Sequence, residues 1–276
     1  MSIDLNLSGE HKKLSCCVGG RLVVVRGGGD LGTGTIYRLW KVGFSVLVLE
    51  APCPLVVRRS VAVAQAVFDG ECCVEGMRAV KISSAEGFDP SLGVNVLIDP
   101  LAESIKMLKP EIVIDAIVAK RNIGTHKEMA PLVIGLGPGF AAPGDVDAAI
   151  ETNRGHNLGR VITNGSPEQD TGDPGIIAGY GKERLLRAPA SGAVKEYRRI
   201  GDSVSKGEII AEVAGLPVKA NVAGIVRGLI HPSAIVTKGL KIGDIDPRND
   251  PSYCLTISDK ALSVAGGVLE AIFSLN

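Results

Sequence analysis

The segment covering residues 22–50, LVVVRGGGDLGTGTIYRLWKVGFSVLVLE, constrains the fold more than any other part of the chain. An apolar run enters a glycine-rich turn, a helical pattern follows, and a second apolar run ends in an acid. Gly27, Gly29 and Gly32 fit the spacing G-x-G-x-x-G. In this order of elements, the spacing predicts a dinucleotide-binding strand–helix–strand unit.

Each glycine has an expected role in this unit. The first allows a tight turn, the second lets the backbone approach a pyrophosphate, and the third lets the helix pack on the strand. A helix starting near Leu31 would direct its free N–H groups at the phosphates. Glu50 would accept hydrogen bonds from ribose hydroxyls and favour NAD over NADP. The predicted cofactor-binding residues are Gly27, Gly28, Gly29, Asp30, Leu31, Gly32, Thr33 and Glu50.

Two residues do not suit the simplest form of this prediction. Asp30 lies inside the turn, where its carboxylate would face an anionic pyrophosphate, and Arg26 lies at the strand end, where apolar residues are usual. An ion pair between them would explain both. The alternative is that the glycines serve packing only and the turn binds nothing.

Composition narrows the class of protein. The chain has 276 residues, enough for two domains, and its net charge of zero gives no reason to expect nucleic acid or an anionic membrane as a partner. No apolar run approaches the roughly 20 residues of a membrane span. Residues 1–20 are polar without a signal-peptide core, so we expect a loose N-terminal extension and a cytoplasmic location.

The six cysteines include no C-x-x-C pair and have no histidine at ligand spacing, so no metal site is expected. We expect them to be buried small side chains in a reducing compartment. A reactive thiol is the alternative, and Cys53, in the loop after the second apolar run, is its best candidate.

An alternation of strands and helices continues after Glu50. Apolar runs at residues 94–99 and 112–115 end in acids and flank an amphipathic segment at 101–108, which predicts two parallel strands and a crossover helix. A further run at 132–135 enters the turn GLGPG at 135–139, which would face the same crevice as Gly27 or serve only as a tight turn. Residues 21–182 are therefore predicted to form a Rossmann-like parallel sheet with helices.

Candidate catalytic residues gather at one place in this domain. Glu151, Arg154 and His156 lie close together around Gly155. His156 would act as a general acid or base, Glu151 would orient it, and Arg154 would bind a phosphate or carboxylate. A helix end with solvated or paired charges explains the same residues equally well.

Residues 183–250 contain an internal repeat with an offset of 32 residues. Ala188, Gly192, Val194, Val204, Lys206 and Gly207 recur as Ala220, Gly224, Val226, Val236, Lys238 and Gly239. The repeat predicts a small β-sandwich that resembles the barrel-sandwich hybrid fold of biotinyl and lipoyl carriers. Lys219 directly precedes the second repeat rather than occupying the hairpin tip at 215–217, so neither biotin nor lipoate is expected.

The last segment, residues 251–276, is predicted to form a strand and a helix that packs back on the body. Ser258 is a suitable N-cap, and apolar residues follow at helical spacing. Gly266 and Gly267 lower helix stability, which indicates the close approach of a neighbouring element.

Several long strings resemble the YqeB-type proteins: VVVRGGGDLGTG, VIGLGPGF, IETNRGHNLGR, RGLIHPSAIVTKGLKIGDIDPR and TISDKALSVAGGVLEAI. The resemblance spans about residues 21–275 and leaves the N-terminal extension outside. It implies an NAD(P)-binding-like Rossmann domain and a link with the maturation of selenium-dependent molybdenum hydroxylases. It places any cofactor role on residues 27–32 and supplies no established catalytic residue.

Three functional hypotheses follow. The favoured one is an accessory protein that binds a dinucleotide, either NAD or the dinucleotide form of the molybdenum cofactor, and serves a molybdenum hydroxylase. The second is an NAD-dependent oxidoreductase with His156 and Glu151 near the nicotinamide. The third is a module that docks a hydroxylase through its β-sandwich and has a vestigial nucleotide site. Whether the chain is an enzyme stays open.

Overall fold

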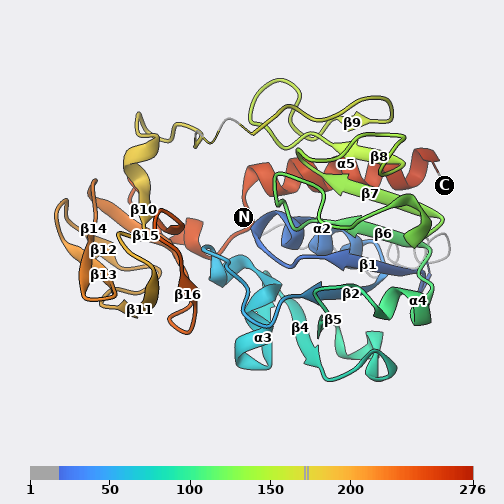
Figure 1. Cartoon of the computed structure of the whole chain (residues 1–276), viewed down its shortest axis with the longest axis horizontal. Helices are drawn as coiled ribbons and strands as arrows, with labels where there is room; N and C mark the ends of the chain where they lie inside the picture. The colour runs from blue at the N-terminus through green and yellow to red at the C-terminus, as the bar shows by residue number, and fades with distance from the viewer. Residues whose placement is uncertain (1–18, 171, 173, 276) are drawn as a thin grey trace, which may run out of the picture.

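The structure is a computed structural model that describes residues 19–170, 172 and 174–275. A nine-stranded sheet carries helices on its faces, and two four-stranded antiparallel sheets lie at one side of it (Figure 1). The predicted N-terminal extension falls almost entirely outside the described residues. None of the described helices has the length and hydropathy that crossing a membrane requires.

Seven neighbouring strands of the large sheet run parallel. In spatial order they are β4 (Met77–Ile82), β5 (Val94–Ile98), β2 (Ser45–Glu50), β1 (Leu22–Arg26), β6 (Ile112–Asp115), β7 (Leu132–Leu136) and β8 (Ala148–Ile150). The two edge strands, β3 (Glu71–Val74) and β9 (Val161–Ile162), pair antiparallel to their neighbours. The sheet is therefore mixed.

Alternate residues of the parallel strands fill two separate cores. Val23 and Val25 of β1 contribute to one core, which also includes apolar residues of α2 (Asp30–Lys41) and α5 (Asp259–Leu275). Val24 contributes to the core on the other face, together with Ile105 of α4 (Ser104–Leu108) and residues from loops. Both faces are covered, which explains why these strands are almost continuously apolar.

Strands β10 to β17 build the two small sheets. They are β10 (Leu185–Arg187), β11 (Gly192–Glu196), β12 (Ser203–Val204), β13 (Ile209–Val213), β14 (Leu216–Lys219), β15 (Gly224–Leu229), β16 (Ile235–Val236) and β17 (Lys241–Asp246). One sheet has the order β10-β17-β15-β12 and the other β14-β13-β11-β16. Replacing each strand by its counterpart in the other repeat converts one order into the other, so the sequence repeat is also a structural repeat. One apolar cluster joins the two sheets.

The small sheets contact the segment that follows β2. Arg59 Nε donates a hydrogen bond to the Leu229 carbonyl of β15 at 2.7 Å, and the Arg59 guanidinium pairs with Glu196 of β11 at 2.8 Å. Gly228 lies so close to Val57 that a Cβ at position 228 would be 2.8 Å from its backbone oxygen. Because this segment starts at the end of β2, the small sheets lie toward the carboxyl ends of the parallel strands.

The fold class predicted from the sequence, a Rossmann-like parallel sheet joined to a biotinyl/lipoyl-type barrel-sandwich hybrid, is wrong. The connections β6–β7 and β7–β8 contain no α-helix, and antiparallel strands close both edges of the large sheet. The crossover helix expected at residues 101–108 is reduced to the five residues of α4. In place of crossover helices, α5 from the end of the chain packs on β7 and β8. The architecture is a large mixed sheet with two antiparallel sheets and a long C-terminal helix.

Candidate functional site

The glycine-rich turn connects the carboxyl end of β1 to the start of α2. Gly27 N donates to the Leu49 carbonyl at 2.8 Å, which ties the turn to β2. The Gly28 carbonyl accepts hydrogen bonds from Ala64 N and from Thr33 Oγ1, both at 3.0 Å. The turn is thus held by backbone bonds on both sides.

Packing explains most of the glycines in this turn. A Cβ on Gly27 would lie 2.9 Å from the Ala116 carbonyl oxygen, and one on Gly32 would lie 2.2 Å from the Gly27 carbonyl oxygen. A Cβ on Gly28 would be 2.8 Å from a Val63 methyl group. Gly29 differs, because its φ of −69° suits any residue and the nearest atom to its Cβ would be 3.7 Å away. No packing requirement accounts for a glycine at position 29.

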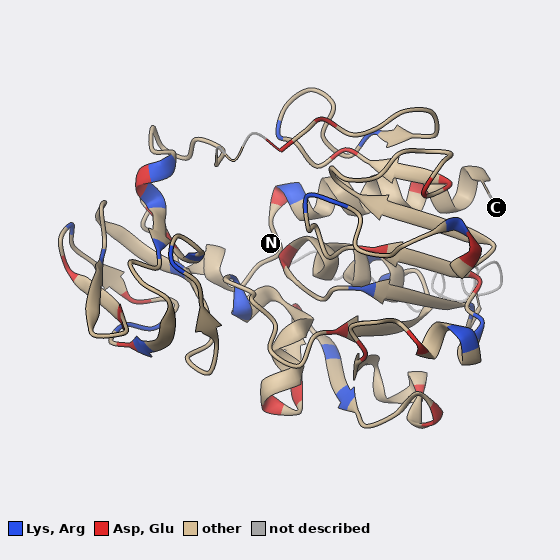
Figure 2. Cartoon of the chain, viewed as in Figure 1, with Lys and Arg blue, Asp and Glu red and all other residues tan. Residues whose placement is uncertain are grey.

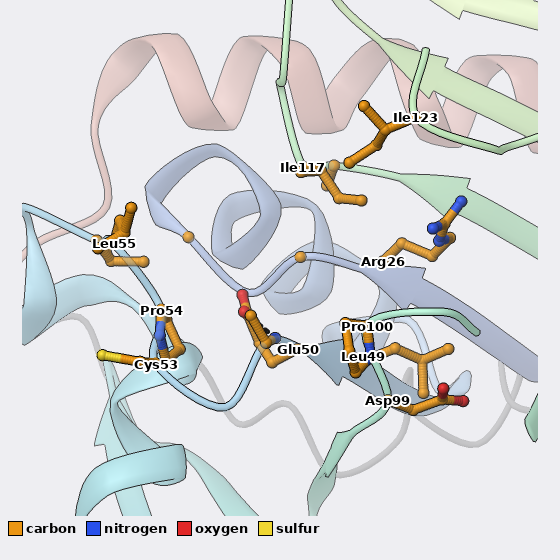
Figure 3. Close-up of a pocket in the computed structure, with 15 residues that line it drawn as sticks. Arg26, Leu49, Glu50, Cys53, Pro54, Leu55, Asp99, Pro100, Ile117 and Ile123 are labelled. Atoms are coloured by element: carbon orange, nitrogen blue, oxygen red, sulfur yellow. Dashed lines mark hydrogen bonds between the residues drawn. The ribbon is translucent and has the colours of Figure 1, made fainter. Parts of the chain in front are cut away.

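Gly29 lines a cavity of about 390 Å³ at the carboxyl ends of β1, β2 and β6 (Figure 3). The cavity has the size typical of small-molecule sites. Leu55, from the segment after β2, and Ile117 and Ile123, from the connection between β6 and β7, bring apolar side chains to it. Cys53 and Asp99 also line it.

Glu50 points at the glycine turn (Figure 3). Its carboxylate accepts a hydrogen bond from Gly28 N at 2.7 Å and another from Ala51 N at 2.9 Å. Burial raises the pKa of Glu50, and these two backbone bonds offset only part of that rise. The carboxylate therefore holds the turn in place, a role that the sequence did not indicate; its expected role with a ribose stays a prediction.

Asp30 and Arg26 do not pair with each other. Asp30 pairs with Arg58 at 2.9 Å, and Arg58, which is buried, also donates to the carbonyls of Tyr253 and Thr256. Arg26 lies 3.6 Å from the Asp115 carboxylate instead. Arg58 was not predicted from the sequence; its charge balances Asp30, the acid that does not suit a position beside a phosphate.

Leu31 and Thr33 contact protein groups rather than the cavity. Thr33 is buried, and its hydroxyl accepts a hydrogen bond from Val63 N at 3.0 Å in addition to the bond that it donates to Gly28. Leu31 packs against the core shared by α2 and α5. Both residues support the turn.

The three candidate catalytic residues are separated in the structure. Glu151 is buried and accepts hydrogen bonds from Asn153 N at 2.6 Å and Glu168 N at 2.7 Å. Arg154 forms two 2.9 Å bonds with Asp259, whereas His156 is exposed. Within the described part of the chain, no hydrogen bond or ion pair joins any two of Glu151, Arg154 and His156. None of the three lines the cavity at the glycine turn.

The second glycine-rich turn also lies away from this cavity. A Cβ on Gly139 would be 2.6 Å from the Arg121 backbone, and one on Gly137 would be 2.6 Å from the Thr152 hydroxyl. Pro138 lines neighbouring cavities. The expectation of a crevice shared with Gly27 is wrong.

The described cysteines are all free. Cys53 and Cys73 are exposed, so the expectation of buried thiols fails for them, whereas Cys254 is buried. Burial, with neighbouring negative charges, raises the pKa of Cys72 to about 11. Within residues 19–170, 172 and 174–275, no group of three or more His, Cys, Asp or Glu side chains could hold a metal ion.

Comparison with known sequences gives one informative relative. Over 265 residues the chain is 47% identical to a protein of Escherichia coli strain K12 named Uncharacterized protein YqeB, and the alignment covers 93% of this chain and 48% of that protein. The chain thus spans about half the length of the curated relative that it matches. This similarity supports a relationship with YqeB-type proteins. No family model matches the chain.

Solved structures with some likeness have low sequence identity. The product-bound ectoine utilization protein EutE (DoeB) from Ruegeria pomeroyi is 10% identical, covers 82% of this chain and 85% of its own, and has a TM-score of 0.25. The succinylglutamate desuccinylase/aspartoacylase from Rhodobacter sphaeroides is 13% identical, with 84% and 87% coverage and a TM-score of 0.27.

Proposed function

We propose that the cavity at the glycine turn binds a ligand containing a pyrophosphate, such as NAD or the dinucleotide form of the molybdenum cofactor. The observation that carries the proposal is Gly29. It lines the cavity and is the one glycine among residues 27–29 and 32 that packing does not require. A glycine at such a position is expected where a ligand approaches the backbone closely.

The start of α2 supplies groups suited to phosphate oxygens. Gly29 is the N-cap and makes no side-chain cap, so the first N–H groups of the helix have no capping side chain. Free N–H groups and the helix dipole favour an anion at this place. Arg58 balances the charge of Asp30 through their ion pair at 2.9 Å. The acid at the helix start therefore does not exclude a phosphate.

The rest of the cavity suits a nucleoside. Leu55, Ile117 and Ile123 present apolar surface, and Glu50 lies beside Gly29 in the lining. A carboxylate oxygen has lone pairs for more than one hydrogen bond. Glu50 can therefore hold the turn and accept a further bond from a ribose hydroxyl.

Binding explains the cavity better than catalysis does. Glu50 is engaged with the turn, and Asp99 accepts bonds from Ser104 and Glu103 N. Burial acts to raise the pKa of Asp99, but the bonds from Ser104 bring it below its usual value, so Asp99 is a poor proton donor. We therefore favour an accessory role, and we propose that this role is in the maturation of molybdenum hydroxylases.

Calorimetric titration with NAD, NADP, CTP and the cytosine dinucleotide form of the cofactor tests the proposal. Gly29→Glu places a carboxylate in the cavity and should weaken binding at least about tenfold, because it opposes charged hydrogen bonds to phosphate. Gly266→Glu is the matched control, since position 266 is exposed and a Cβ there meets nothing within 4 Å. It should bind as the wild type does.

The ligand preference then separates the hypotheses. A preference for the cytosine dinucleotide would support a maturation role, and a preference for NAD would support a redox or NAD-sensing role. Unchanged binding in Gly29→Glu would contradict the proposed site. If no nucleotide binds, the proposal fails and a protein-docking function takes its place.

A further inference from the structure

A second cavity lies on the other side of the end of β6. It has a volume of about 320 Å³ and is lined from the carboxyl ends of β6, β7 and β8 and from the first turn of α5. Ile117 lines the cavity at the glycine turn, whereas Val118 lines this one. The two cavities are therefore neighbours but have different linings.

Three cations line the second cavity: Lys120, Arg154 and Lys260. Two of them already have partners, because Lys120 pairs with Asp170 at 2.5 Å and Arg154 forms its two bonds with Asp259. Acidic and basic residues lie together at the beginning of α5, where Lys260 follows Asp259 (Figure 2).

Lys260 is half-buried, and no hydrogen bond or ion pair with the rest of the described chain holds its amine. Burial lowers the pKa of Lys260, as does the charge of Arg154, and the more distant charges of Asp30, Asp170 and Glu151 oppose this. An ammonium withdrawn from water without a partner is unfavourable. A bound anion would supply the missing partner.

The backbone on one side of the cavity is strained. Val118 has a φ of 56° and Lys120 a φ of 65°, both in the left-handed region. For a β-branched residue such as Val118 this conformation is rare. The close contact of Gly139 with the Arg121 backbone holds this segment in place. Strain of this kind persists where the surroundings fix the backbone, and it clusters at ligand sites.

The cavity also offers neutral polar groups. Thr152, Asn153 and Gln169 line it beside the cations, together with Glu168 and Asp170, whose carboxylates are engaged with Asn153 and Lys120. The Asn153 amide is oriented by Glu168, whose carboxylate accepts its Nδ2 hydrogen bond at 2.6 Å. Hydroxyl and amide groups next to an unpaired ammonium are the groups that bind carboxylates and phosphates.

We infer that this cavity is a second ligand site, separate from the glycine turn, which binds a small molecule through a carboxylate or phosphate group, with Lys260 as its counter-charge. Lys120 and Arg154 flank the same anion while keeping their own partners. The site gives a role to the strained segment after β6 and to the second glycine-rich turn, which the proposed dinucleotide cavity leaves unexplained.

Titration of the full chain with inorganic phosphate and, separately, with succinate at constant ionic strength tests the inference. Lys260→Gln should weaken binding of the preferred anion at least about tenfold, the effect of losing one charge-assisted hydrogen bond. Lys238→Gln is the matched control, because Lys238 is exposed on the small sheets and does not line the cavity. Any phosphate bound at the glycine turn would survive Lys260→Gln, so only the binding that Lys260→Gln loses is assigned to this cavity.

A second measurement uses the wild-type chain. In protein with isotope-labelled lysine, the Lys260 amine resonance, identified by its absence in Lys260→Gln, should shift on anion addition. Absence of binding, or equal binding by Lys260→Gln, would each overturn the inference. Lys260→Gln should melt no lower than the wild type, because it removes an unpaired charge; a clear drop would show that the amine has a structural partner and would also overturn it.

Discussion

The two adjacent glycines of α5 should respond in opposite directions to the same substitution. Both lie in the interior of the helix, where alanine is more favourable than glycine by about 1 kcal/mol. A Cβ on Gly266 meets nothing within 4 Å, whereas a Cβ on Gly267 would lie 2.0 Å from the Gly159 carbonyl oxygen. Gly159 is held by the hydrogen bond from its N to the Glu151 carbonyl at 2.9 Å. The obstacle at Gly267 is therefore backbone that moves only at a cost.

These contacts determine how much each substitution should change the free energy of unfolding. Gly266→Ala should raise the free energy of unfolding by about 1 kcal/mol. Overpacking costs about 1–3 kcal/mol, and a carbonyl oxygen at this distance places Gly267→Ala at the upper end, for a net loss of about 2 kcal/mol. For a chain of this size, the expected changes in melting temperature are about +2 to +4 °C and −4 to −8 °C.

Thermal unfolding followed by circular dichroism, with urea unfolding as a second measure, checks both variants. The two substitutions add the same methyl group to neighbouring residues of one helix, so helix propensity cancels in their comparison. Equal melting temperatures for the two variants, or a stabilising Gly267→Ala, would refute the packing of α5 against the loop after β8. The sequence predicted close approach at both glycines; this is confirmed at Gly267 and wrong at Gly266.

Two further predictions concern ion pairs. Asp115→Asn leaves the buried Arg26 without its carboxylate partner and should lower the free energy of unfolding by about 3–5 kcal/mol. Urea titrations measure this loss, and a loss below about 1 kcal/mol would contradict the burial of the pair. The hydrogen bonds from Arg154 lower the pKa of Asp259, so its contribution is present above the usual value of 3.8 and is lost as the pH falls through the lower pKa of the folded state. Because the Asp259 side chain is largely exposed and that of Arg154 partly so, Asp259→Asn should cost only about 0.5–1 kcal/mol at neutral pH. Urea midpoints of the variant and the wild type measured against pH should converge in acid, and a constant difference would contradict the pairing.

Single strands were predictable from the sequence, but their assembly was not. The two apolar runs within residues 22–50 correspond to β1 and β2, and the runs at 94–99, 112–115 and 132–135 correspond to β5, β6 and β7 to within a residue or so. These strands are buried on both faces, and continuous apolar runs report that burial directly. The crossover helix expected at residues 101–108 is reduced to the five residues of α4, whereas the sheet face at β7 and β8 is covered by α5, which is more than 100 residues further along the chain. The local sequence pattern does not show that a helix so distant in the chain covers this surface.

The charge balance of the candidate site was equally invisible in the sequence. Arg58 reaches Asp30 across 28 residues from a segment without regular periodicity. Lys260 belongs to a helix that the sequence predicts from its apolar spacing. Only the tertiary structure shows that Lys260 lies beside Arg154. A single charged residue gives no periodic pattern, so its partner is set by tertiary structure alone.

The spacing of the glycines therefore carries two kinds of information that the sequence cannot separate. Gly27, Gly28 and Gly32 are needed because β1, α2 and the end of β6 approach one another closely, and this need exists with or without a ligand. A chain that had lost its ligand would keep these three. Gly29 has a permissive backbone and free space for a Cβ, so close packing does not require a glycine there. Because alanine at position 29 fits the fold without strain, any effect of Gly29→Ala on ligand affinity reports what the cavity holds rather than whether the turn is formed.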